Sequence, residues 1–152
     1  MLSMKAKYAL KALSDLARLP QGEILASNDI AMRHGISKKF LDAILGDLRT
    51  AGIVATRKGR SGGYHLVRPA DLVSVGEVLR VLDGPLAPIA CASRTAYAPC
   101  HDCADPVSCG VRLTMMEVRD AIARVLDTKT LRDLSLTGLP VLAATEPVAA
   151  AR

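Results

Sequence analysis

The first half of the chain alternates apolar and polar residues with the period of an α-helix. Residues 4 to 19 place their apolar side chains largely on one stripe, and Pro20 and Gly22 end that segment. A second, short helix is expected to run to about residue 33, with either Ser27 or Asn28 as its N-cap. The pattern therefore begins with two helices joined by a turn.

A third helix is expected soon after the second one. Gly35 suits the tight turn between them, because glycine adopts backbone angles that other residues avoid. Ser37 is the expected N-cap of the third helix, and Gly52 ends it. Its strongly apolar face consists of Phe40, Leu41, Ile44, Leu45 and Leu48. A short helix, a glycine turn and a capped helix are the outline of a helix-turn-helix.

Two β-prone runs come next, IVATR at 53 to 57 and YHLVR at 64 to 68, joined by KGRSGG. Their spacing predicts a hairpin with a glycine-rich, cationic tip. A helix-turn-helix followed directly by such a hairpin is typical of a winged helix. The expected fold is therefore mainly α with a small β-hairpin wing, and residues 1 to 85 are assigned to this winged helix-turn-helix domain.

The second half of the chain predicts a capped helix and a longer one. Ser74 and Glu77 have the spacing of a capping box at the start of the first, and Gly84 ends it. Asp105 and Pro106 are the expected N-cap and first residue of the second, which runs to about residue 127.

The long helix has apolar positions separated alternately by four and three residues, as in a coiled coil. These positions are Val111, Met115, Val118, Ile122 and Val125. Such a seam favours a homodimer, although it can also pack on the chain's own domain. Residues 111 to 134 are assigned to a dimerisation helix, and the small-residue segment 135 to 152 to a disordered tail.

The distribution of charge along the chain indicates a binding partner. Residues 1 to 70 contain 12 Lys and Arg against 5 Asp and Glu, whereas residues 71 to 152 contain 8 against 10. A basic first half favours double-stranded DNA as the partner, with a merely solvated basic surface as the alternative. No arrangement of nucleophile and base or phosphate-binding loop points to an enzyme.

The hydropathy pattern also bears on location. No run of 18 apolar residues exists, so no membrane span and no membrane partner are expected. The first residues lack the continuous apolar run of a secretory signal, which predicts a cytoplasmic protein.

The DNA contacts are expected from two places. The third helix would enter the major groove with its first turn, which carries Ser37, Lys38, Lys39 and Asp42. Asp42 can accept a hydrogen bond from a cytosine amino group, or it can pair with Lys38 one turn earlier. The wing would contact phosphates or the minor groove, with glycines that let the backbone approach the DNA. Its candidate residues are Arg57, Lys58, Arg60, Gly62 and Gly63.

All four cysteines, Cys91, Cys100, Cys103 and Cys109, lie within 19 residues. Their spacing lacks the two CxxC pairs of a zinc ribbon, and the strand–helix context of a thioredoxin motif is absent. In a reducing compartment, irregularly spaced thiols on a loop favour an iron–sulfur cluster, with zinc binding and a thiol redox switch as alternatives. At the start of a helix, Cys109 is favoured as a thiolate. Residues 86 to 110 are assigned to a cysteine-rich cluster-binding loop.

The stretches KAKYALKALSDLA, ISKKFLDAILGDLRTAGIV and RKGRSGGYHL, followed by a cysteine loop and a long helix, resemble a known family. This is the family of winged-helix iron–sulfur transcriptional regulators that includes IscR, NsrR and RirA. The resemblance covers roughly residues 1 to 135, and LRTAG followed by GRSGGYHL is its most specific part. It implies a homodimer whose loop holds a [2Fe-2S] or [4Fe-4S] cluster that sets operator affinity. It also implies Cys91, Cys103 and Cys109 as loop ligands.

Two positions depart from the family pattern. Arg112 stands where some members have a histidine ligand, and Lys7 stands where the nitric-oxide sensor has an acidic one. The chain offers Cys100 instead, with His101 beside it, so we predict ligation by four thiolates, with His101 as the less favoured substitute for Cys100.

The resemblance also equates Lys58 with the family's minor-groove arginine and Asp42 with its base-reading acidic residue. The expected function is a dimeric regulator, in the simplest case a repressor, that responds to iron, redox or nitric-oxide status through a cluster, with [2Fe-2S] slightly preferred. The alternative is a zinc-stabilised or thiol-redox winged-helix regulator without a cluster.

Overall fold

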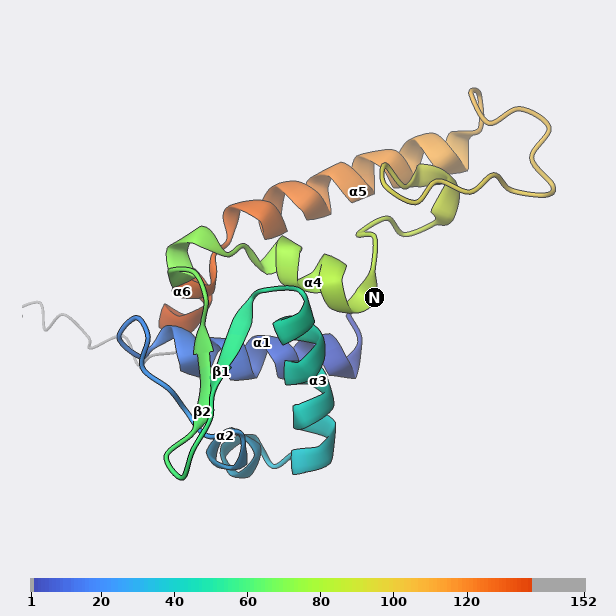
Figure 1. Ribbon diagram of the computed structural model, residues 1–152. Helices are drawn as coiled ribbons and strands as arrows, with labels where there is room; N and C mark the ends of the chain where they lie inside the picture. Colours follow the sequence, from blue (N-terminus) through green and yellow to red (C-terminus); the bar gives the residue numbers. More distant parts are fainter. Residues whose placement is uncertain (1, 138–152) are drawn as a thin grey trace, which may run out of the picture.

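The computed structural model describes residues 2 to 137, which form a helical body and a projecting arm (Figure 1). The elements are α1 (Met4–Ala17), α2 (Ser27–His34), α3 (Lys38–Thr50), β1 (Val54–Arg57), β2 (Gly63–Leu66), η1 (Ala70–Leu72), α4 (Val75–Asp83), η2 (Ala90–Ala92), α5 (Gly110–Thr128) and α6 (Leu131–Leu136). The predicted mainly helical winged fold is confirmed. None of the helices in this part of the chain is long and apolar enough to cross a membrane.

The body is built around α1, which packs against α3, α4 and α6. Its inner face carries Ala6, Ala9 and Ala12, all fully buried, and these small side chains let the neighbouring helices approach closely. The predicted apolar face of α3 supplies a large share of the core, with four of its five side chains buried. Phe40 is the exception, and its ring packs edge-on against Tyr8 at a centroid distance of 6.1 Å.

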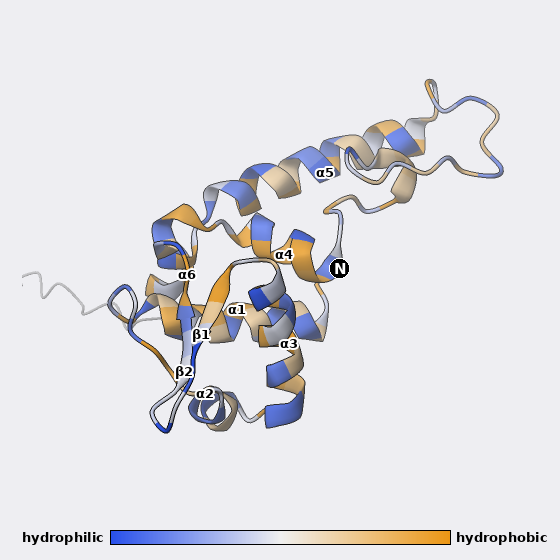
Figure 2. Cartoon of the chain, in the orientation of Figure 1, coloured by the Kyte–Doolittle hydropathy of each residue, from blue (hydrophilic) through white to orange (hydrophobic). Residues whose placement is uncertain are grey.

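The two strands form an antiparallel hairpin, the wing, with Val54 opposite Leu66 and Arg57 opposite Gly63. The wing is attached to the body by a pair of backbone hydrogen bonds, from Leu25 N to Tyr64 O at 3.0 Å and from Tyr64 N to Leu25 O at 2.9 Å. Figure 2 shows that β1 is hydrophobic at its start, where it leaves the body, and that the tip of the wing is hydrophilic.

Two helix starts differ from those expected. Neither Ser27 nor Asn28 caps α2, because the helix begins at Ser27 and its N-cap is Ala26. The long helix α5 begins at Gly110 rather than after Asp105. The Asp105 carboxylate instead accepts hydrogen bonds from the amide of Val107 at 2.9 Å and from Ser108, so it closes a separate turn before the helix.

The expected dimerisation helix is also shorter than 111 to 134, since α5 ends at Thr128. A capping box formed by Thr130 and Asp133 starts α6, which turns the fully buried Leu131 back into the core. The junction is pinned to the start of α4 by hydrogen bonds from Val75 N to Lys129 O and from Leu131 N to Val73 O. Residues 135 and 136 of the expected tail belong to α6, and residues 138 to 152 lie outside the described part of the chain.

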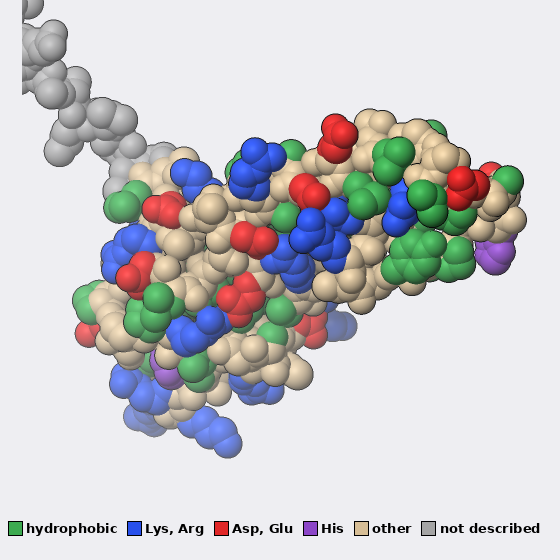
Figure 3. Space-filling model, turned by 90° about the horizontal axis from the view of Figure 1, so that it is seen from above, with side chains coloured by type: hydrophobic (Ala, Val, Ile, Leu, Met, Phe, Trp, Pro, Cys, Tyr) green, Lys and Arg blue, Asp and Glu red, His purple; other side chains and the backbone are tan. Residues whose placement is uncertain are grey.

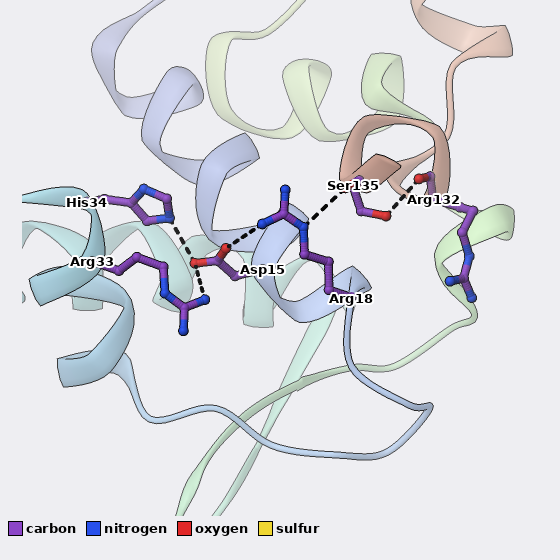
Figure 4. A network of polar contacts seen from close by, with 6 residues as sticks. All are labelled: Asp15, Arg18, Arg33, His34, Arg132 and Ser135. Carbon is purple, nitrogen blue, oxygen red and sulfur yellow. Dashed lines mark hydrogen bonds and ion pairs between the residues drawn. The ribbon is translucent and has the colours of Figure 1, made fainter. Parts of the chain in front are cut away.

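A buried carboxylate connects three helices of the body (Figure 4). Asp15 of α1 is 3% exposed and lies 2.8 Å from His34 Nε2 and 3.2 Å from Arg33 Nη1, both in the last turn of α2. Arg18, 3.7 Å from the same carboxylate, donates from Nε to the carbonyl of Ser135 in α6. The position of α2 is therefore linked through α1 to the end of α6.

Replacing Asp15 with alanine is expected to lower the free energy of unfolding by about 3 kcal/mol, because it removes the buried partner of this cluster of basic side chains. Chemical denaturation measures the change. Asp47→Ala is the matched control, because Asp47 pairs with Lys5 on the surface and is expected to contribute less than about 1 kcal/mol. Equal effects of the two substitutions would contradict the assigned role of Asp15.

Candidate functional site

The helix α2, the first turn of α3 and the wing tip lie together at one end of the body (Figure 1), and their surface is hydrophilic (Figure 2). A groove of about 400 Å³ runs between them. The structure brings five predicted residues together along it: Lys38 from α3, and Arg57, Lys58, Gly62 and Gly63 from the wing. Ser27 and Asn28 of α2 line the same groove. The sequence pattern assigned them only a capping role, so their contribution to this surface was missed.

The first turn of α3 is fixed by its cap and presents basic side chains. Ser37 Oγ accepts a hydrogen bond from the amide of Phe40 at 3.2 Å, as predicted for the N-cap. Lys39 is exposed, whereas Lys38 forms an ion pair with Asp42 at 2.5 Å. Of the two contacts considered for Asp42, the pair with Lys38 is the one present without DNA. Lys38 contacts only Oδ2 of Asp42, so Oδ1 of this exposed carboxylate can still accept a hydrogen bond from a base.

The wing tip exposes Arg57, Lys58 and Arg60. The two glycines that follow leave room for the protein's own backbone. A Cβ on Gly62 would lie 2.5 Å from the carbonyl oxygen of Arg57, and a Cβ on Gly63 would lie 2.6 Å from that of Leu25. Glycine at these two positions is therefore required for the hairpin to close and to dock on the body.

We expect Gly63→Ala to lower the free energy of unfolding by about 2 kcal/mol, because the added methyl group pushes against the backbone that pairs with Tyr64. Gly46→Ala in α3 is the matched control. Nothing lies within 4 Å of its added Cβ, so the change is expected to be neutral or to stabilise the helix by up to about 1 kcal/mol. Thermal unfolding of both variants measures the difference, and a harmless Gly63→Ala would contradict the packing argument.

The cysteine loop projects from the far end of α5, away from the groove (Figure 1). Cys91 is buried in η2, Cys100 is exposed, and Cys103 and Cys109 are half-buried. The pKa shifts relate the thiols two by two: Cys91 raises the pKa of Cys100, and Cys103 and Cys109 shift each other's pKa in opposite directions. The charge of Cys91 also raises the pKa of Cys103, and that of Cys103 raises the pKa of Cys100, so all four thiols influence one another. His101 is exposed beside Cys100.

The pKa values of the thiols divide according to their surroundings. The hydrogen bond with Cys91 raises the pKa of Cys100, and partial burial together with the neighbouring Cys109 raises that of Cys103. The pKa of Cys109 is lowered, first by a hydrogen bond from the backbone amide of Arg112. Cys109 is the N-cap residue of α5, and free amides at a helix start stabilise a thiolate.

The loop offers ligands for a metal cofactor that binds through sulfur. Its four thiols are soft donors, the ligand type that iron–sulfur clusters use and that zinc also accepts. Among residues 2 to 137, no three His, Cys, Asp or Glu side chains converge closely enough to hold one ion. Neither a zinc site nor a four-thiolate cluster site is therefore preformed in this part of the chain.

The helix α5 carries apolar side chains that its own chain leaves uncovered. Val111, Val118 and Val125 of the predicted seam are 66%, 38% and 57% exposed, and Met115 and Ile122 are half-buried. Figure 3 shows apolar side chains interspersed with charged ones along this arm. An apolar groove of about 620 Å³ lies beside it, between the start of α1, α4 and α5.

A helix-turn-helix with a basic first turn in its second helix, next to a cationic wing, defines a winged-helix DNA-binding regulator. The chain belongs to the Rrf2 family, described as iron-dependent transcriptional regulators, whose model matches residues 2 to 136. IscR, NsrR and RirA belong to this family, so the resemblance noted in the sequence is confirmed. The family consists of transcriptional regulators, not enzymes.

Individual relatives agree with this assignment over nearly the whole chain. An rrf2-like protein of Rhodobacter capsulatus, named as a regulator of the helix-turn-helix type, is 46% identical over 143 residues, which are 92% of this chain and 95% of the relative. The structure of CymR, the global cysteine regulator of Bacillus subtilis, is 30% identical, with a TM-score of 0.73 over 89% of this chain and 95% of that one. IscR of T. potens is 28% identical, with a TM-score of 0.69 over 88% and 85% of the two chains.

Proposed function

We propose that this chain is a homodimeric repressor whose affinity for its operator is set by a [2Fe-2S] cluster bound to Cys91, Cys100, Cys103 and Cys109. The presence of all four free cysteines in the one loop that leads into α5, with thiols that shift one another's pKa, carries the proposal. The description of the family as iron-dependent supports it. When bound, such a cluster supplies a redox-active group whose presence depends on iron supply and oxidation state.

The groove between α2, α3 and the wing is the proposed DNA site. Lys39 and Ser37 enter the major groove with the first turn of α3, where Asp42 accepts a hydrogen bond from a cytosine amino group. On the other side, the cationic tip that contains Arg57, Lys58 and Arg60 follows the backbone into the minor groove. Ser27, Asn28 and the free amides at the start of α2 bind the intervening phosphate.

A second copy of the chain is proposed to pack against the exposed apolar side chains of α5. The exposed valines at 111, 118 and 125 need an apolar partner, and a two-fold axis through α5 would pair each seam with its copy. Such a dimer also presents two recognition helices to the two halves of a palindromic operator.

The effect of the loop on DNA must be transmitted, because in one chain the loop and the DNA groove lie at opposite ends (Figure 1). Arg80 of α4 forms a two-pronged ion pair with Asp127 of α5, at 2.6 and 2.8 Å. From α5 the path continues through the pinned junction into α6, and through Arg18 and Asp15 to α2. A shift of α5 is thereby coupled to the helix-turn-helix, in addition to any contact between the two copies.

Anaerobic purification followed by visible absorption spectroscopy and counting of iron and sulfide tests this proposal. The expected result is a coloured protein with about two irons and two sulfides per chain. A coloured protein with about four of each would correct the cluster type to [4Fe-4S]. A colourless protein with about one zinc per chain would overturn the cluster in favour of a zinc-stabilised regulator.

A thiol-redox regulator is the second candidate, favoured by the mutual effect of Cys103 and Cys109 on their pKa values and by the likeness to a solved cysteine regulator. In this scheme the Cys109 thiolate and the Cys103 thiol lose two electrons and their remaining proton to a peroxide and form a disulfide. Peptide mass spectrometry of metal-free protein, before and after peroxide treatment, measures the disulfide. If the protein never holds iron and loses operator binding reversibly as the disulfide forms, the thiol-redox regulator would be favoured over the cluster regulator.

A further inference from the structure

The helix α5 has one buried residue, and its side chain is charged. Arg119 is 7% exposed, whereas every other residue of α5 is half-buried or exposed. Its Nη1 donates to the carbonyl of Ala92 in η2, and its Nε donates to Asp120 at 2.8 Å. Burying a guanidinium group is unfavourable unless its hydrogen bonds are satisfied, so a buried arginine on an otherwise exposed helix indicates a specific role.

A second arginine of α5 holds both ends of the cysteine segment. Arg112 Nε donates to the carbonyl of Cys91 at 2.9 Å, and its Nη1 donates to the carbonyl of Pro106 at 3.2 Å. The same guanidinium lies over the ring of Tyr97, 6.0 Å from its centre. The backbone amide of Arg112 faces the Cys109 thiol. One residue therefore contacts the beginning, the middle and the end of the loop.

The two arginines act on neighbouring points of the same turn. They are seven residues apart, which is about two helical turns and places them on one face of α5. They hold the carbonyls of adjacent residues, Cys91 and Ala92. The turn itself is closed by short-range backbone hydrogen bonds, from Ala92 N to Ile89 O and from Ser93 N to Ala90 O, both at 3.1 Å. The buried Cys91 is thus placed by its backbone.

We propose that Arg112 and Arg119 form an arginine clamp that fixes the Cys91 turn to α5 and so holds Cys91 next to Cys100, at a set position relative to Cys109. This rests on the proposed function of the loop as a cluster site, and it gives Arg112 a role as a positioning residue where the family resemblance implies a histidine ligand. Ligands held in place before metal binding lose less conformational freedom when the site assembles. The clamp also connects the loop to the helix that transmits its state.

The test uses reduced, metal-free protein and measures how fast each cysteine reacts with iodoacetamide at one fixed pH, by peptide mass spectrometry. In Arg112→Gln and Arg119→Gln, alkylation of the buried Cys91 is expected to become at least about tenfold faster, because the turn opens more often. The rate at the exposed Cys100 is expected to change less than about twofold. Arg124→Gln is the matched control, since Arg124 is an exposed arginine of the same helix.

Arg119→Lys separates charge from geometry. Lysine keeps the positive charge but lacks the forked donors of arginine, so its Cys91 rate is expected to lie between those of the wild type and Arg119→Gln. Circular dichroism identifies any variant that fails to fold. Arg119 is buried, so Arg119→Gln can fail to fold. In that case the clamp is tested by Arg112→Gln and by hydrogen exchange of the wild-type protein. The amides of Ala92 and Ser93 are expected to exchange more slowly than those of residues 100 to 104.

Unchanged alkylation of Cys91 in Arg112→Gln, or exchange at Ala92 and Ser93 as fast as in residues 100 to 104, would overturn the clamp. Iron counting of the wild type reports separately on the proposed function. If the wild type contains no iron but Arg112→Gln still speeds the alkylation of Cys91, the clamp is supported and the proposed cluster is rejected. An iron-loaded Arg112→Gln that keeps its cluster as long as the wild type would reject the contribution of the clamp to cluster binding.

Discussion

Reversing the charge of Lys39 and Lys58 together is expected to weaken operator binding by about a hundredfold, with about tenfold from each substitution if the two act independently. Lys39 is exposed in the first turn of α3, and Lys58 is exposed at the tip of the wing, on the two sides of the proposed DNA site. Each side chain is expected to neutralise one phosphate or to approach a base edge. Each substitution should therefore also reduce the slope of log affinity against log salt concentration by about one, because about one fewer counterion is released on binding.

Fluorescence anisotropy at several salt concentrations measures both effects, with an operator selected from a random pool of duplexes by the wild-type protein. Lys129→Glu is the matched control, because Lys129 is an exposed lysine at the junction of α5 and α6, away from the groove. Its reversal changes the net charge by the same amount. Equal losses in the control and in the single variants would mean that net charge alone, and no particular face, attracts the DNA.

Serine in place of Cys103 is expected to reduce the iron content of the anaerobically purified protein to near zero and to remove its visible absorption. The pKa of Cys103 responds to both Cys109 and Cys91, which places its thiol among the other thiols of the loop. A serine hydroxyl is a harder and much less acidic ligand than a thiol and does not replace a thiolate on iron. Ser108→Ala is the control, since it changes the same loop without removing a thiol.

The same assay separates Cys100 from His101 as the fourth ligand. Cys100→Ser is expected to lose iron as Cys103→Ser does, because the pKa of Cys100 responds to Cys91, whereas His101→Ala is expected to keep it. Loss of iron in His101→Ala together with retention in Cys100→Ser would assign the fourth position to the histidine. Retention of iron in Cys103→Ser would contradict the four-thiolate ligation on which the proposed function rests.

The winged helix could be predicted because its signals are local. The cap at Ser37, the apolar face of α3 and the glycine-rich turn between two β-prone runs each determine a short segment by themselves. The Ser74 cap of α4 and its end at Gly84 were likewise readable, although Glu77 pairs with Arg68 and does not complete the expected capping box. Local patterns of this kind largely determine the type of each element.

The parts that could not be predicted depend on contacts between distant segments. Asp15 has no local signal of burial, since its partners Arg33 and His34 are supplied by α2. The clamp pairs Arg112 and Arg119 with carbonyls 21 and 27 residues earlier in the chain. The end of α5 was predicted within a residue of Thr128, but the return helix α6 was missed, although Thr130 and Asp133 have the spacing of a capping box.

The most direct test of the account compares the operator affinity of cluster-loaded and cluster-free protein, prepared anaerobically from the same batch and measured at the same salt concentration. If the cluster stabilises the DNA-binding arrangement of the dimer, the loaded protein is expected to bind at least about tenfold more tightly, as is usual for coupling between two sites. Equal affinities of the two forms for that operator would contradict a regulator controlled by its cysteine loop.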